Sequence, residues 1–175
     1  MKKIKRIVSL LLYYSFAIYL PNYSFPGGKI YNGIRILFLR GVFPVGKGCR
    51  IMRNVYVGSG KDISIGSFSR INENVRLCNV KIGDHVMVAR DTVFLGKTHN
   101  TESVKIPMER QGNIKLLQSQ IQNDVWIGLR CIIMPGLKIS RGSIIGAGSL
   151  LTKDTDENTV YGGVPAKIIK KRGEQ

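Results

Sequence analysis

The chain has 175 residues, with 27 Lys and Arg against 11 Asp and Glu, so its formal net charge is +16. This length allows one domain with a core of ordinary size, and a hydrophobic content of 43% excludes a wholly disordered chain. Two His residues exclude a metal centre built from three His ligands of one chain. Three Cys without a CxxC spacing indicate a reducing compartment.

The first 44 residues form a basic and apolar segment. Its apolar run, residues 7–20, is shorter than the roughly 20 residues that a membrane-spanning helix needs, and no signal-peptide cleavage site follows it. Residues 30–43 repeat the apolar and basic pattern and predict a second short helix. Two interpretations stay open and can both hold. The segment caps the end of the fold, or it lies on the inner face of a membrane with its basic residues near anionic lipid.

The remaining positive charge gathers at the other end of the chain, where residues 166–175 form a basic tail. No zinc finger, basic zipper or RNP-type motif accompanies either basic segment, so we expect no nucleic-acid partner.

From residue 45 onward, aliphatic or aromatic residues recur at steps of six, in runs of which the first three are joined by steps of eight and five residues. These anchors are Val45, Ile51, Val57, Ile65, Ile71, Leu77, Ile82, Val88, Phe94, Ile127, Ile133, Ile139, Ile145 and Leu151. The residue two before each anchor is uncharged, and positions i and i−2 of a strand share one side. Each hexad therefore predicts a short strand with two inward side chains, and the Gly that often follows an anchor permits a corner. Cys49 and Cys131 fall on inward positions and are interpreted as buried small hydrophobes.

Three such strands per coil predict an all-β solenoid, a three-sided column stacked by parallel β hydrogen bonds, in preference to a β-sandwich. The period lapses between Phe94 and Ile127, and residues from about 96 to 121 are expected to form an extruded loop. Long loops in compact solenoids are usually functional. His99 lies at the start of this loop, whereas His85 falls on an outward turn and is expected to be a surface residue.

Four motifs in the second half of the chain resemble the hexapeptide-repeat acyltransferases. They are Asn123-Asp-Val-Trp-Ile-Gly128, Ile145-Gly-Ala-Gly-Ser149, Thr152-Lys-Asp154 and Gly163-Val-Pro-Ala-Lys167. With the hexads and the loop His, the resemblance covers residues 45–170, and it is greatest to maltose- and galactoside-type and polysaccharide-modifying sugar O-acetyltransferases. It implies a left-handed parallel β-helix over residues 45–165, and a homotrimer with sites between subunits.

The resemblance also implies acetyl transfer from acetyl-CoA, without a metal, to a hydroxyl of a sugar or saccharide acceptor. This reaction needs a base for the hydroxyl proton, a role suited to His. His99 matches the family's catalytic His, and the group that orients it, Glu102 or a backbone carbonyl, stays open. Asn72 matches an acceptor-contacting Asn, although an Asn of a solenoid turn fits equally well.

The same comparison places Trp126 near the thioester end of the site, with packing on a flat face as the alternative. Positions that match contacts to acetyl-CoA are Leu129 and Ala147 along the pantetheine arm, and Thr152, Lys153, Lys167 and Lys170 near the phosphates. For the two C-terminal lysines, a solvated basic tail is the alternative.

The function expected from these features is sugar O-acetylation in surface polysaccharide or lipopolysaccharide biosynthesis, in the cytoplasm or at the inner face of the membrane. Acetylation of an amino sugar or of serine is a second enzymatic interpretation. Serine-specific relatives carry a larger helical N-terminal domain than the 44 residues found here. A non-catalytic β-helix scaffold is the third interpretation, and a γ-type carbonic anhydrase is excluded because it needs three His.

Overall fold

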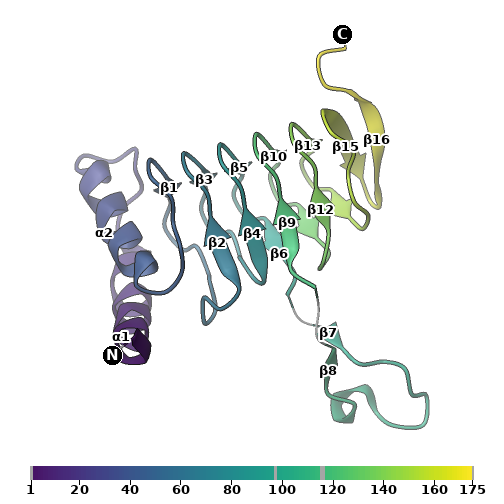
Figure 1. Cartoon of the computed structure of the whole chain (residues 1–175), viewed down its shortest axis with the longest axis horizontal. Coiled ribbons are helices and arrows are strands. Elements are labelled where there is room, and N and C mark those ends of the chain that lie inside the picture. The colour runs from purple at the N-terminus through teal and green to yellow at the C-terminus, as the bar shows by residue number, and fades with distance from the viewer. Residues whose placement is uncertain (1, 97, 115–116, 175) are drawn as a thin grey trace.

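The computed structural model describes residues 2–96, 98–114 and 117–174 (Figure 1). Two helices, α1 (Lys2–Ser15) and α2 (Gly28–Arg40), begin the chain, and the 3-10 turn η1 (Ala17–Tyr19) lies between them. A column of short strands follows. Figure 1 shows the helices at one end of this column, the C-terminal strands at the other, and one long loop projecting from its side.

Each coil of the column adds a short strand to parallel sheets that run along it. The first sheet contains β1 (Arg50–Ile51), β3 (Arg70–Ile71), β5 (Met87–Val88), β10 (Trp126–Ile127), β13 (Ile144–Ile145) and β15 (Thr159–Gly163). The second contains β6 (Val93–Phe94), β11 (Ile132–Ile133) and β14 (Leu150–Leu151), and the third contains β2 (Ile63–Ile65), β4 (Val80–Ile82), β9 (Ser119–Ile121) and β12 (Lys138–Ile139). In the middle coils the chain visits the first, second and third sheets in that order, as in β5, β6 and β9 and then in β10, β11 and β12.

The inward positions predicted from the six-residue period form the core. Every anchor is buried, with no more than 8% of its surface exposed. The residues two before the anchors are buried as well, except Leu137, which is partly buried against the core. Burial raises the pKa of the Cys49 and Cys131 thiols, in agreement with their interpretation as small hydrophobes.

Among the glycines that follow anchors, Gly58 has the positive φ expected of a corner, 53°, whereas the others do not. Gly128 has no positive φ, but a Cβ there would lie 2.6 Å from the backbone nitrogen of Ala147 in the next coil. The left-handed backbone at this corner lies two residues after each glycine. It is found at Arg130, after Gly128, and at Gly148, after Gly146, with φ of 54° and 71°. Close stacking of coils, more than a sharp corner, therefore requires glycine at residue 128, and the expectation is corrected.

The N-terminal helices cap the open edge of the first coil with polar side chains. The Asn32 amide nitrogen donates to the Cys49 carbonyl at 3.0 Å, and its oxygen accepts from the Ile51 N–H at 2.8 Å. Asn32 thus pairs with β1 much as a neighbouring strand would. The Tyr13 hydroxyl donates to the Val55 carbonyl at 2.6 Å. These contacts confirm that the N-terminal segment caps the fold.

Arg35 holds the same junction from inside. Its side chain is fully buried and donates to the carbonyls of Ala17 at 3.1 Å and Ile51 at 3.3 Å, and also to those of Leu20 and Pro21. Burial lowers the pKa of this guanidinium, and the four carbonyls compensate its charge. Among the helices described, none has the length and apolarity needed to cross a membrane.

The extruded loop separates β6 from β9 and carries its own antiparallel pair. Strand β7 (Thr98–His99) pairs with β8 (Asn113–Ile114), and the 3-10 turn η2 (Met108–Arg110) lies between them. The column resumes at β9. At the C-terminal end, β16 (Ala166–Lys171) pairs antiparallel with β15, so most of the segment expected as a basic tail forms a strand.

Candidate active site

Three of the expected site residues lie on one corner of the column, between the first and second sheets. Asn72, Leu129 and Ala147 each come just after a strand of the first sheet. The turns stack directly here, because the Asn72 N–H donates to the Val88 carbonyl at 3.0 Å and the Gly148 N–H donates to the Leu129 carbonyl at 2.7 Å. This corner offers backbone groups along a row of coils.

His99 lies at a different corner, between the second and third sheets, where the loop leaves the column after β6. It is paired with Asn113 across β7 and β8, and the following Asn100 N–H donates to the Gly112 carbonyl at 3.0 Å. The imidazole is exposed, and its side chain has no hydrogen bond or ion pair within the described part of the chain. The strand pairing fixes the backbone position of His99, and the exposed imidazole ring is accessible to a substrate.

Glu102 does not orient His99 in this chain. Its backbone N–H donates to the Asn100 side-chain oxygen at 3.0 Å, and its exposed carboxylate makes no ion pair with a described residue. The orienting group left open by the sequence is therefore not supplied by the described residues of a single chain.

The expected phosphate-binding residues occupy two places. Thr152 and Lys153 follow β14 on the corner from which the loop emerges, two coils further along, and both are exposed. Lys167 and Lys170 lie on β16 and are exposed as well. The Lys170 ammonium donates to the Glu174 carbonyl at 2.8 Å, a neutral partner that leaves its charge available to an anion.

Trp126 lies on the outer surface of the first sheet. It is 47% exposed and is in register with Met87 on one side and Ile144 on the other. An aromatic residue between two apolar neighbours on a flat face suits both packing against another copy and contact with a ligand. His85 is exposed and stacks on Phe68 with ring centroids 5.1 Å apart, as expected for a surface residue.

The structure adds two cavities that the sequence did not suggest. One, of about 710 Å³, lies at the root of the loop and includes Cys78, Asn113 and Ile114 in its lining. Asn113, the strand partner of His99, is one of the lining residues, although His99 itself does not line the hollow. Its residues come from four separate segments, which no local motif could join.

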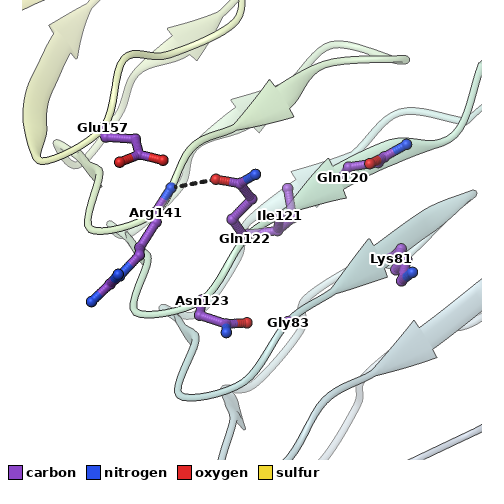
Figure 2. A pocket seen from close by; sticks show the side chains of 8 residues that line it. All are labelled: Lys81, Gly83, Gln120, Ile121, Gln122, Asn123, Arg141 and Glu157. Atoms are coloured by element: carbon purple, nitrogen blue, oxygen red, sulfur yellow. Dashed lines mark hydrogen bonds between the residues drawn. The ribbon is translucent and has the colours of Figure 1, made fainter.

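The second cavity, of about 460 Å³, lies over the third sheet and is polar (Figure 2). Figure 2 shows Lys81, Gln120 and Arg141 around it, and the Arg141 N–H donates to the Gln122 side-chain oxygen at 2.8 Å. None of the expected site residues lines it. Within the described ranges, no group of three or more His, Cys, Asp or Glu side chains is arranged to hold a metal ion.

Comparison with known proteins finds galactoside, lipopolysaccharide and chloramphenicol acetyltransferases. No protein-family model matches it. It is 34% identical over 129 residues to a galactoside O-acetyltransferase of Escherichia coli K12, a match that covers 72% of this chain and 62% of that protein. It is 32% identical over 157 residues to a putative lipopolysaccharide biosynthesis O-acetyl transferase of the same strain, covering 71% of this chain and 80% of the relative.

A solved galactoside acetyltransferase in complex with coenzyme A is 30% identical, with a TM-score of 0.77, and the match covers 97% of this chain and 82% of that one. The chain belongs to the hexapeptide-repeat acyltransferases. The resemblance drawn from the four motifs is thus confirmed at the level of the family. The chain spans about 62% of the length of the galactoside O-acetyltransferases it matches.

Proposed function

We propose that the chain transfers an acetyl group from acetyl-CoA to a hydroxyl of a sugar or saccharide, with His99 as the general base. The observation that carries the proposal is the loop itself. It interrupts a regular column once, and its β7–β8 pair holds the exposed His99 opposite Asn113, which lines a cavity of about 710 Å³ at the root of the loop. Relatives named as galactoside and lipopolysaccharide O-acetyltransferases support the reaction class.

The proposed chemistry needs one proton acceptor that is neutral near pH 7. The His99 imidazole takes the proton of the acceptor hydroxyl while the oxygen attacks the thioester carbonyl. A C–O bond forms, the C–S bond then breaks, and the departing thiolate recovers the proton from the imidazolium. Because the imidazole has no partner among the described residues of its own chain, substrate or a neighbouring copy must complete its surroundings.

The residues expected to hold acetyl-CoA fit its chemistry. Leu129 and Ala147 lie on directly stacked turns of neighbouring coils, a place where peptide groups can meet the amide groups of a pantetheine arm. Exposed Lys153, Lys167 and Lys170 offer positive charge to phosphates. A galactoside acetyltransferase of similar structure was solved with coenzyme A, which supports acetyl-CoA as the donor.

Asn72 and His99 follow strands of different sheets and belong to different corners of the column, which supports a site shared between two copies. We therefore propose a homotrimer in which the His99 corner of one copy faces the Asn72 corner of the next. Closed symmetric association repeats one such interface around a ring. Trp126, exposed beside the Asn72 corner on the first sheet, would lie near this junction.

Three finer features remain part of the proposal. The column is expected to wind with the left-handed sense of the family. The relative named for lipopolysaccharide biosynthesis supports a role in surface polysaccharide or lipopolysaccharide modification. A cytoplasmic location suits an enzyme that uses acetyl-CoA and keeps Cys49, Cys78 and Cys131 as free thiols.

The test is release of free thiol from acetyl-CoA in the presence of a mixed panel of sugars, amino sugars and serine. The wild-type chain should consume the thioester with a neutral sugar, and His99→Ala should lower turnover by at least about 100-fold, because a positioned base contributes that much or more. Circular dichroism should show an unchanged fold, since the imidazole is exposed.

His85→Asn is the matched control, because His85 is the other exposed His and Asn tolerates its φ of 58°. This variant should keep wild-type turnover. Near-normal activity of His99→Ala would refute the assignment of the base. Thioester consumption with amines alone would show that the acceptor is an amine and not a sugar hydroxyl. No consumption with any acceptor would favour a scaffold.

A further inference from the structure

Helix α1 presents an apolar stripe to solvent. Its members are Ile4, Ile7, Val8, Leu11 and Leu12, which are 68%, 50%, 47%, 64% and 42% exposed. Their spacing of three and four residues places them on one side of the helix. Five aliphatic side chains gathered on one helix face form a surface that soluble proteins usually cover.

The opposite side of α1 is already occupied by the column. Ser9 and Tyr13 are buried, the Tyr13 hydroxyl is bonded to the Val55 carbonyl, and the Arg6 guanidinium donates to the Ser59 carbonyl at 2.6 Å. One face of α1 therefore holds the helix against the column, and the apolar stripe on the other face is exposed to solvent.

Charge surrounds this stripe with a single sign. Successive residues of a helix are about 100° apart, so Lys3 and Lys5, both exposed, flank the stripe on opposite sides. Residues 1–61 hold eleven Lys and Arg, and the first acidic residue of the chain is Asp62. The capped end of the column therefore combines an exposed apolar strip with positive charge that has no acidic side chain of its own segment to neutralise it.

We propose that α1 lies in the surface of an anionic lipid bilayer, with its stripe at the boundary between headgroups and acyl chains and its lysines beside lipid phosphates. Amphipathic helices with Lys at the edges of an apolar face bind membranes in this way. The helix cannot span a bilayer, since it has 14 residues. A second copy docked on the same stripe would bring two basic ends together, a like-charge contact that disfavours association.

This inference is independent of the proposed acetyl transfer, because none of the residues placed in the reaction lies on α1. The probe is a set of vesicles, one of phosphatidylcholine alone and one containing phosphatidylglycerol, mixed with the full-length chain in a flotation assay. The chain should bind the anionic vesicles and not the neutral ones, and binding should weaken as salt rises.

Two double variants test the two parts of the surface. Ile7→Ser with Leu11→Ser shortens the apolar stripe, and Lys3→Gln with Lys5→Gln removes the flanking charge; each pair should weaken anionic-vesicle binding by roughly tenfold or more. All four side chains are exposed, so the fold should persist. Lys81→Gln with Lys138→Gln, an equal loss of exposed charge on the third sheet, should change binding less than twofold.

The proposal is overturned if the wild-type chain ignores anionic vesicles, or if both α1 variants bind them as tightly as wild type does. It is also overturned if Ile7→Ser with Leu11→Ser leaves vesicle binding unchanged but lowers the mass measured by light scattering. That result would show that a second copy, not lipid, covers the stripe.

Discussion

Single residues are most tightly constrained where one coil lies on the next. A side chain at residue 128 would meet the backbone of Ala147, which belongs to the following coil. At Gly148, a Cβ would meet no atom within 4 Å, and the positive φ of 71° is what favours glycine. Glycine is therefore required at residue 128 by close packing between coils and favoured at residue 148 by a left-handed backbone.

This difference predicts that Gly128→Ala destabilises the chain more than Gly148→Asn does. Alanine at 128 must push two coils apart, and overpacking of this kind costs about 1–3 kcal/mol. Asn tolerates the left-handed region, so the change at 148 should cost less than about 1 kcal/mol. Urea unfolding measures both, and equal losses of stability would contradict the stacking explanation.

His99 shows what a sequence can and cannot reveal about one residue. Its place at the break of a regular period, together with the family motifs, identifies it as the candidate base. Its strand partner Asn113 comes from the far side of the loop, and the cavity that Asn113 lines also draws residues from three further segments of the chain. Because the hydrophobic pattern is weak there, no local signal predicts that pairing.

At the scale of secondary-structure elements, the strands of the column can be predicted from the sequence more fully than the contacts of the N-terminal cap. Strands such as β3 and β5 follow from the period, since burial demands an apolar residue at every inward position. The cap depends on polar residues within an apolar segment, and the bonds of Asn32 and Arg35 join positions 14 to 19 residues apart. Strand β16 escapes prediction because five of its six residues are exposed, so no buried face imposes a period-two pattern on its sequence.

The Tyr13 hydroxyl tests how strongly α1 is held to the first coil. Tyr13→Phe leaves the Val55 carbonyl without its donor, which should cost about 1–3 kcal/mol in urea unfolding at pH 7. Tyr19→Phe, at a residue that is 66% exposed, should cost almost nothing. Equal effects of the two changes would show that α1 contributes little through this bond.

The same residue predicts a dependence of stability on alkaline pH. Burial raises the pKa of Tyr13 well above its ordinary value of about 10, so its stabilising contribution is complete below pH 10 and is lost as the pH rises toward the folded-state pKa. The wild-type chain should therefore lose more stability above pH 10 than Tyr13→Phe loses.

At the scale of the whole molecule, the order in which the chain visits its sheets decides what one copy can do. Residues that follow the first sheet, such as Asn72, lie on one corner, and the loop with His99 leaves from another. The six-residue period predicts both corners. The period does not predict how several copies associate. Association depends on outward-facing residues such as Trp126, which the period does not constrain.

A site shared between copies is tested most directly by mixing two defective chains. If the chain assembles into the proposed trimer, His99→Ala and Asn72→Ala chains that are co-expressed with different affinity tags and purified through both should yield trimers that contain each variant. If His99 of one copy and Asn72 of the next build each site, about one site in three is intact in such a trimer, and about a third of wild-type thioester consumption should return. Mixed trimers of confirmed composition that stay as inactive as either parent would contradict the shared site.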